Sequence, residues 1–405
     1  LRRKGILKRK EPLRFQLLGS IDNPNRTQIF FTPLSGINYY DGLTPGIAFY
    51  NSVFFPKKIN LLLVPQYGVK SNSFVGLGSL SVPFYLKNSF LHSITFTSAA
   101  RSYTFGHPSL GAEEKFFDQR YLRFTQWLTF DLKKNNPRSS VDQKIIYRNI
   151  FLRQQTLIGA DATASSLPYE NSVFNTVSYS YSDRRVINPF HLRASTEFGN
   201  AKSDDYVKVF GEGDFIITYP RRRTGLDIRF FGGVFLNPPT SSAYKLRLTA
   251  TTGPDDYLFD DIFPGRSEDQ GFFAQQISLG DDGGFKMRTN GVSPRIGESS
   301  KWILSMNLKA PMPFFTPLFV FADGGISPQD ESNSFAGYDA FQYDAGVGFT
   351  IIPKIIEVYY PAFYSQDIKN NLINTDFYKY WYQRITFTFN FEKVNPFEIA
   401  RNITP

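Results

Sequence analysis

A chain of 405 residues that is 41% hydrophobic and 17% aromatic spreads its apolar side chains thinly, and no stretch approaches the roughly 18 apolar residues of a membrane helix. This excludes a helical membrane protein but not a membrane barrel, which exposes only every second strand residue to lipid. The absence of cysteine excludes disulfides and thiolate metal sites, and the net charge of +9 includes six cations in the opening LRRKGILKRK.

The basic N-terminal segment lacks the interleaved aromatic residues of a nucleic-acid-binding arm, and no domain that recognises bases accompanies it, so no nucleic-acid partner is expected. Such a segment is typical of a solvated linker or of a strip lying against anionic lipid head groups. We predict that residues 1–26 form a basic periplasmic linker. Because the chain starts at Leu1 without an initiator methionine, we also expect further residues to precede it.

From residue 27 onward, apolar residues recur with period two. The stretch 122–132 reads LRFTQWLTFDL and the stretch 381–391 reads WYQRITFTFNF, each with one largely apolar and one largely polar face. A soluble sandwich would turn the apolar face inward, whereas a membrane barrel would turn it outward. Strand length and the placement of aromatic residues therefore have to decide between these two architectures.

Both features favour the barrel. The predicted strands run about 10 to 15 residues, beyond the usual length of about five or six and long enough for a tilted membrane strand. Aromatic residues gather at their ends, as in Tyr39-Tyr40, Tyr359-Tyr360 and 380–382, as in the aromatic girdles at membrane interfaces. We predict an all-β fold, a transmembrane antiparallel β-barrel over residues 27–391.

Short turns alternate with looser connections along this region. The short turns lie near 55–58, 87–88, 135–137, 188–189, 221–223, 311–313 and 352–354, and the looser connections near 38–42, 71–73, 105–118, 159–170, 200–205, 237–299, 327–338 and 366–380. This alternation predicts 16 strands, with 14 or 18 as alternatives. Both termini fall on the side of the short turns, which is the periplasmic side in bacterial outer-membrane barrels.

Several strands carry charged residues on the face opposite the apolar one. They are Arg193, Glu197, Lys208, Glu212, Asp214, Asp227, Arg229 and Lys309. In a barrel these side chains would line the lumen as a network of mixed sign. In a soluble protein they would lie on a solvated face. The charged residues therefore indicate a surface in contact with water, and they do not identify a substrate.

Signals for catalysis are weak. The histidines His92, His107 and His191 are far apart, and the chain has no H-E-x-x-H, G-x-S-x-G or P-loop motif. No catalytic residue is therefore assigned. The acidic residues of 255–282 are of the type that binds calcium, but their spacing matches no EF-hand, and a solvated or lumen-facing loop is the preferred interpretation. We expect no metal or cofactor in this segment.

The connection 237–299 is too long and too polar for another hairpin and joins the predicted strands 11 and 12. With that placement, the chain resembles the superfamily of outer-membrane insertases and two-partner-secretion transporters. There the long loop carries a V-R-G-F/Y tip inside the lumen, and strand 13 carries F-x-D-x-G. The segment 321–325, FADGG, matches the strand motif through Phe321, Asp323 and Gly325. The resemblance implies that Gly265 and Arg266 form the tip and that Arg266 contacts Asp323, although Gly265 precedes Arg266 instead of following it.

A second resemblance covers nearly the whole chain. Segments such as QIFFTPLSGINYYD, FPKKINLLLVPQYG and RITFTFNFEKVNPFEIAR are similar to the C-terminal region of zinc-aminopeptidase-like (gluzincin) envelope proteins of Bacteroidota. This resemblance implies that a metallopeptidase domain precedes Leu1 and would hold the zinc ion. Residues 392–405 are then expected to form a periplasmic tail.

Together these patterns predict the bacterial outer membrane as the location, with both termini periplasmic, outer-membrane lipid as surroundings and envelope proteins as partners or clients. The predicted function is to anchor a larger peptidase-like protein and to assist insertion or translocation of outer-membrane proteins. The strands 28–37 and 381–391 would form the closing seam. The alternatives are a passive porin or solute channel and a structural subunit of an envelope complex, and the residues do not decide among them.

Overall fold

The computed structural model describes residues 13–17, 27–51, 57–87, 89–110, 115–157, 160, 166–201, 204–220, 225–280, 282–289, 295–312, 317–328, 338–353, 355–373 and 378–390. The chain divides into two compact units, Leu1–Thr129 with Leu152–Tyr169, and Phe130–Phe151 with Glu170–Pro405. Across the described ranges, no helix has the length and apolar character needed to cross a membrane.

The first unit is built from a meander of antiparallel strands, in which β2 to β6 pair in sequence order. The short strand β1 pairs with β2 in parallel, and β7 and β8 form a small separate sheet. The strands of this unit are β1 (Leu13–Leu17), β2 (Thr27–Asn38), β3 (Gly42–Tyr50), β4 (Asn60–Gly68), β5 (Ser73–Tyr85), β6 (Leu91–Gly106), β7 (Ser109–Leu110), β8 (Lys115–Phe116) and most of β9 (Gln119–Leu132).

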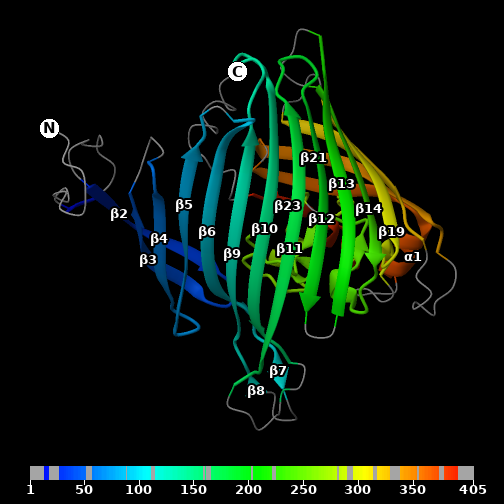
Figure 1. Cartoon of the computed structure of the whole chain (residues 1–405). Coiled ribbons are helices and arrows are strands. Elements are labelled where there is room, and N and C mark those ends of the chain that lie inside the picture. The colour runs from blue at the N-terminus through cyan, green and yellow to red at the C-terminus, as the bar shows by residue number, and fades with distance from the viewer. Residues whose placement is uncertain are drawn as a thin grey trace. The chain divides into compact units, whose positions relative to one another are not determined.

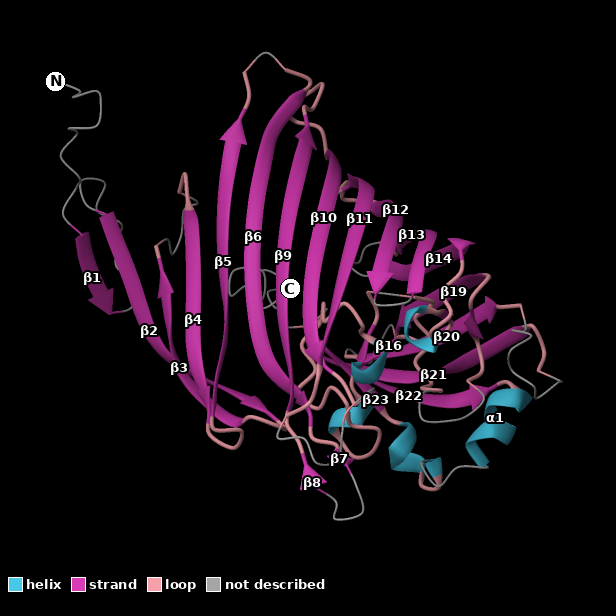
Figure 2. Ribbon diagram, turned by 60° about the horizontal axis from the view of Figure 1, so that its bottom comes forward, coloured by secondary structure: helices cyan, strands magenta, loops and turns pink. Residues whose placement is uncertain are grey.

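The second unit continues the same pattern, and Figures 1 and 2 both show β10 to β14 running side by side. Each strand from β11 onward pairs antiparallel with the next strand of the main sheet. The strands are most of β10 (Val141–Gln155), β11 (Tyr169–Asp183), β12 (Phe190–Ala201), β13 (Asp204–Thr218), β14 (Gly225–Asn237), β19 (Trp302–Pro311), β20 (Leu318–Ile326), β21 (Phe341–Ile352), β22 (Ile356–Tyr364) and β23 (Thr386–Phe389).

The predicted strand count is confirmed. Among the described residues the main sheet contains 17 strands, and setting aside the parallel strand β1 leaves 16 from β2 to β23. The longest connection joins β14 to β19, which are strands 11 and 12 of this series, as predicted. The sheet is not closed, because no pairing among the strands that the structure describes joins β23 to β2. The predicted seam between 28–37 and 381–391 would join the two units and stays a prediction.

The end of the chain differs from the prediction of one long strand over 381–391. A 3-10 turn, η5 (Trp381–Arg384), precedes β23, and residue 391 lies outside the described residues. The turn is closed at its start, because the backbone N of Tyr380 donates to Oε1 of Gln383 at 2.7 Å and the backbone N of Gln383 donates back to the carbonyl of Tyr380 at 3.1 Å. These two bonds bend the backbone away from an extended strand. The helix α1 (Gln366–Ile373) lies in the connection just before it.

The domain boundaries predicted at the two ends stay predictions. Residues 13–17 of the expected linker 1–26 form β1, while the rest of that linker and the tail 392–405 lie outside the described residues.

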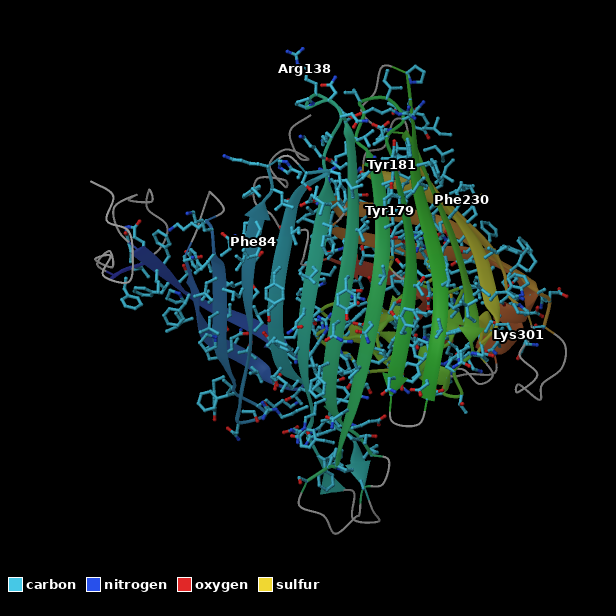
Figure 3. All side chains as sticks on the ribbon, in the orientation of Figure 1. Phe84, Arg138, Tyr179, Tyr181, Phe230 and Lys301 are labelled. Carbon is cyan, nitrogen blue, oxygen red and sulfur yellow. The ribbon has the colours of Figure 1, made fainter. Side chains whose placement is uncertain are left out.

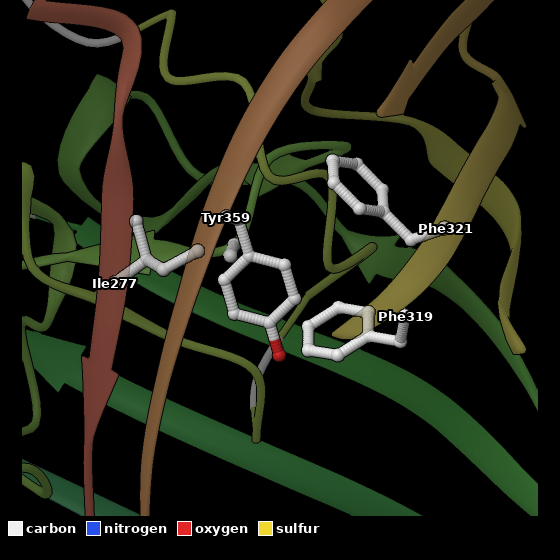
Figure 4. Packing of buried hydrophobic residues seen from close by; sticks show 5 residues of the cluster. Ile277, Phe319, Phe321 and Tyr359 are labelled. Carbon is white, nitrogen blue, oxygen red and sulfur yellow. The ribbon is translucent and has the colours of Figure 1, made fainter. Parts of the chain in front are cut away.

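The connection 238–301 folds onto one face of the second unit's sheet, as expected of a loop inside a lumen. It contains η1 (Ser242–Tyr244), β15 (Leu246–Arg247), β16 (Thr251–Thr252), η2 (Gly253–Asp255), η3 (Phe273–Gln275), β17 (Ile277–Ser278) and β18 (Glu298–Ser299). β15 pairs with β18, and β16 pairs with β17. The loop and the sheet share a core in which Ile277 packs with Phe319, Phe321 and Tyr359, with Tyr359 lying between Ile277 and the two phenylalanines (Figure 4).

Burial alternates along the strands in the sense that the sequence predicts for a barrel. In β20, Leu318 and Val320 are exposed, while Phe319, Phe321 and Asp323 are buried under the loop. Tyr179 and Phe230, which Figure 3 labels, likewise belong to the exposed face of the sheet. The face that carries the loop is polar and covered, and the opposite face is apolar and open.

Candidate functional site

The site begins with the F-x-D-x-G motif of β20, whose aspartate is completely covered by the loop. Lys286 of the loop reaches Oδ1 of Asp323 with its Nζ at 2.8 Å, and the two side chains are 7% and 0% exposed. Asn307 of β19 donates to the same oxygen at 2.9 Å. Lys286 also donates to the carbonyl of Gly284 at 2.8 Å. A buried carboxylate needs such a cationic partner, because leaving it unpaired in a dry site is costly.

The predicted contact between Arg266 and Asp323 is not formed, and this is a correction. Arg266 stays inside the loop, where its Nη1 binds Oδ2 of Asp256 at 2.9 Å and the Asp256 carbonyl at 3.1 Å, and its Nη2 donates to the carbonyl of Asp261. Its guanidinium also lies over the ring of Phe259 at 4.5 Å. The acidic turn around 256–261 uses the hydrogen-bond donors of Arg266. Arg266 therefore stabilises the fold of the loop and does not attach the loop to the covered face of the sheet, which we call the wall.

The resemblance predicts an arginine at the loop tip, whereas the cation that meets Asp323 is the lysine Lys286. The residues around the true contact read Gly283-Gly284-Phe285-Lys286, which contain the glycine, aromatic and cationic residue types of the family tip in a different order. Gly284 has a φ of +73°, and a Cβ there would lie 2.8 Å from Nη1 of Arg229. A glycine that brings the loop backbone so close to the wall was the signal that could have identified this segment.

Asp344 of β21 is a second wall carboxylate that the sequence analysis missed. It is 0% exposed and stands directly across from Asp323 in the β20–β21 register. Its Oδ2 accepts a hydrogen bond of 2.5 Å from the backbone N of Met287, the residue after Lys286. Two neighbouring strands therefore hold two consecutive loop residues, one through its side chain and the other through its backbone.

Gly325, the last residue of the motif, makes room for the loop. A Cβ at this position would lie 2.6 Å from Cδ2 of Leu248 and 3.2 Å from Cε1 of Phe285, both in the loop. At the neighbouring Gly324, by contrast, the nearest atoms are ring carbons of Phe341 at 3.5 Å, an ordinary contact distance. A Cβ at Gly325 would also lie 3.0 Å from the Leu304 carbonyl of β19, so close packing against the loop and against the neighbouring strand both favour glycine here.

The wall charges predicted to form a network of mixed sign are largely brought together. Arg193 and Arg229 both lie 3.5 Å from carboxylate oxygens of Glu212. Lys208 lies 3.4 Å from Glu197, and Tyr257 of the loop donates to that glutamate at 2.5 Å. The network therefore includes the loop as well as the wall.

Two further pairs complete the predicted set. Lys309 forms an ion pair with Glu357 of β22 at 2.5 Å and not with Asp323. Asp214 lies 3.6 Å from His191, and Asp227 is the register partner of Lys309 on the adjacent strand.

His191 also contacts Ser180 at 3.0 Å, which gives a serine, histidine and aspartate on three adjacent strands. The 3.6 Å separation between His191 and Asp214 is too long for the hydrogen bond that fixes the histidine in a catalytic triad. The Asp214 side chain is moreover 49% exposed. We therefore treat these residues as part of the wall network.

Inside the loop, pairs of charged residues stabilise the loop's own fold. Asp255 lies 2.7 Å from Arg295 and 3.4 Å from Arg247. Burial opposes ionisation of this aspartate, but the two guanidinium groups prevail and hold the pKa of Asp255 below its ordinary value. In its described residues the loop is thus a charged and internally paired structure.

Between the loop and the sheet remains a cavity of about 620 Å³, whose mixed polar and apolar lining includes His191, Asp214, Asp227, Lys309 and Glu357. Side chains of both signs line it. No group of three or more histidine, cysteine, aspartate or glutamate side chains within the described ranges is arranged to hold a metal ion. The arrangement is suited to holding the loop against the wall through charge pairs.

A scan against protein-family models and a search of curated proteins each find no match to this chain. Among solved structures, it is similar to BamA from Haemophilus ducreyi lacking POTRA domains 1–3, at 12% identity and a TM-score of 0.42, over 85% of this chain and 70% of that one. It is also similar to CdiB from Acinetobacter baumannii, at 8% identity and a TM-score of 0.42, over 86% and 61% of the two chains. For CdiB from Escherichia coli the values are 11% and 0.42, over 85% and 63%. The chain thus spans less than two thirds of each CdiB chain, and similarity at this level assigns no function by itself.

Proposed function

We propose that this chain is an outer-membrane β-barrel of the insertase and two-partner-secretion type, with the loop 238–301 as a plug. The observation that carries the proposal is the two-faced sheet of the second unit. One face exposes large apolar side chains such as Leu304, Phe349 and Ile351, while the other holds a charged loop through Lys286 and Asp323. An apolar face of this size suits lipid, and strands suit it because their backbone groups are paired within the sheet.

In this proposal the short turns and both termini face the periplasm, the apolar face contacts outer-membrane lipid, and envelope proteins are partners or clients. The chain is the membrane module of a larger envelope protein, which it anchors and positions. A zinc peptidase domain before Leu1 is the finer form of this proposal. Reading the gene upstream of Leu1 tests it, because an H-E-x-x-H motif with a downstream glutamate supports the fusion and tandem small periplasmic repeats argue for an insertase instead.

Membrane reconstitution tests the barrel and its plug together. We expect the purified chain to require detergent, to insert into liposomes, and to change mobility on gels when heated. In planar bilayers the native chain should conduct little, and Lys286→Ala should increase the conductance, while the exposed control Lys134→Ala should not. Large steady currents that Lys286→Ala leaves unchanged would support the porin alternative. A chain that is monodisperse without detergent would refute the barrel.

A further inference from the structure

A groove of about 930 Å³ crosses the exposed, apolar face of the second unit's sheet, on the side opposite the loop. Its lining is almost entirely apolar and comes from β11 to β14 and β19 to β21, with Tyr179, Tyr181, Phe230 and Leu304 among its residues. Figure 3 shows Tyr179, Tyr181 and Phe230 on this face, with Tyr181 nearer than Tyr179 to the turn that carries Arg138. The groove therefore belongs to the face that the proposed barrel turns to lipid.

The groove is hollow because small residues lie side by side at its floor. Ala194 of β12 is the register partner of Gly211 in β13, and Gly211 is the partner of Gly232 in β14. A Cβ added at Gly211 would lie 3.4 Å from the carbonyl oxygen of Arg193, and beyond its chain neighbours no side-chain atom of the described residues would lie within 4 Å. Glycine weakens a strand and often marks a position that another molecule approaches closely. Packing within the chain thus does not account for Gly211.

A row of aromatic rings borders the groove towards the short turns. The rings of Tyr181, Phe190, Phe215 and Phe230 follow one another across β11 to β14, with successive centroids 5.7, 5.9 and 6.1 Å apart. Tyr181, Phe215 and Phe230 also line the groove. Such rows are typical of the level at which a barrel passes from lipid tails to head groups. The groove therefore begins at this level and extends towards the lipid tails.

Two arginines stand beside the aromatic row. The guanidinium of Arg185 lies over the ring of Phe190 at 5.3 Å. The side chains of Arg184 and Arg185 are 75% and 52% exposed, and their Nε atoms lie 3.6 Å from Asp142 and 3.8 Å from Asp183. These separations are longer than a hydrogen bond. Both guanidinium groups are thus open to an anion from outside the chain.

The arginines belong to a rim of two joined turns with a surplus of positive charge. The backbone N of Arg184 donates to the carbonyl of Ser140 at 3.0 Å, and Oγ of Ser140 donates to Asp183 at 2.6 Å. Residues 131–144 and 183–187 together hold six cations and three carboxylates, namely Lys133, Lys134, Arg138, Lys144, Arg184 and Arg185 against Asp131, Asp142 and Asp183. Val186 and Ile187 are exposed beside them. Cations next to exposed apolar side chains suit the surface of an anionic membrane.

We propose that the groove and the two arginines form a binding site for a phospholipid with an anionic head group. The phosphate lies at Arg184 and Arg185, and an acyl chain lies in the groove. Three strand residues separate Tyr181 from Arg184, about 10 Å at about 3.3 Å per residue, so one lipid reaches both. Because strands of a barrel are tilted, a groove that crosses them slopes into the membrane. The inference rests on the proposed membrane barrel and names the lipid class and its place.

Photocrosslinking in liposomes tests the proposal. Two phospholipids carry the same photoreactive acyl chain and differ only in the head group, which is anionic phosphatidylglycerol in one and zwitterionic phosphatidylcholine in the other. At low salt we expect phosphatidylglycerol to label the groove residues 192–194, 211–213 and 230–232 several-fold more than phosphatidylcholine does. The preference should shrink in high salt, because the charges at the rim are exposed. Mass spectrometry of the peptides identifies the labelled residues.

Variants at the rim separate charge from structure. Arg184→Gln with Arg185→Gln should reduce labelling by phosphatidylglycerol to the level of phosphatidylcholine, whereas Arg184→Lys with Arg185→Lys should retain the preference. The matched control is Lys301→Gln with Lys369→Gln, which removes two exposed cations on the side of the long loops. It should leave the preference unchanged.

A variant at the floor tests the groove itself. Gly211→Leu should lower the labelling of 230–232 by both lipids several-fold. Ala322→Leu adds the same side chain to the exposed face outside the groove and should not. Equal labelling by the two lipids in the native chain, or a preference that the two glutamines leave unchanged, would overturn the lipid site. So would a groove that neither lipid labels because a second copy of the chain covers it, whereas a chain that does not insert into liposomes would instead refute the proposed barrel.

Discussion

Removing the ammonium group of Lys286 is the sharpest test of how the loop is held. Lys286→Ala leaves Asp323 buried, with a hydrogen bond from Asn307 and with the Asp344 carboxyl as its neighbour across the strands, but without a cation. Breaking a buried ion pair from one side costs about 3–5 kcal/mol. We therefore expect the ratio of docked to undocked loop to fall by roughly two to three and a half orders of magnitude.

Limited proteolysis of the folded protein in detergent measures this ratio, since cleavage follows the population of the open form when opening is fast. The matched control is Lys134→Ala, which removes an ion pair of 2.7 Å to Asp142 whose side chains are 35% and 29% exposed. Such a pair contributes only about 0–1 kcal/mol, so cleavage of the loop should barely change.

A second variant separates charge from packing. Lys286→Met combined with Asp323→Asn removes both charges of the pair, and we expect it to protect the loop better than Lys286→Met alone, because residue 323 is then no longer a buried carboxylate without its cation. The reasoning is refuted if Lys286→Ala opens the loop no more than Lys134→Ala, or if the double variant is as labile as Lys286→Met.

Three further predictions address the motif and the plug. Gly325→Ala should destabilise the docked loop by about 1–3 kcal/mol through overpacking, whereas Gly324→Ala on the apolar face should cost less; equal thermal midpoints for the two variants would contradict this. Arg266→Ala should make the loop more protease-sensitive, but a double-mutant cycle with Asp323→Asn should give a coupling energy near zero, and a coupling above about 1 kcal/mol would restore the originally predicted pair. The pKa of Asp255 is lowered in the folded loop, so the ionised Asp255 stabilises the loop fully above the ordinary pKa of 3.8, and this stabilisation is lost as the pH falls through the folded pKa. Asp255→Asn should therefore weaken the increase in loop cleavage that acid causes between about pH 5 and pH 2.

The strands of the sheet could be predicted from local residue patterns. Alternation of apolar and polar residues in β9 and β20 fixes which face each side chain occupies, because successive side chains of a strand point to opposite sides. Turn residues separate the strands at regular intervals, so the count of 16 and the position of the long loop were both predictable. The motif 321–325 was found for the same reason, since it is local and lies within one strand.

The loop residue that meets Asp323 could not be predicted from such local patterns. Lys286 and Arg266 are both cations in the same loop, and the choice depends on how residues far apart in the chain pack together. The acidic turn at Asp256 uses the donors of Arg266, while the glycine at 284 brings Lys286 to the wall. The groove over Gly211 was equally hidden, because the register between neighbouring strands decides which small residues lie side by side.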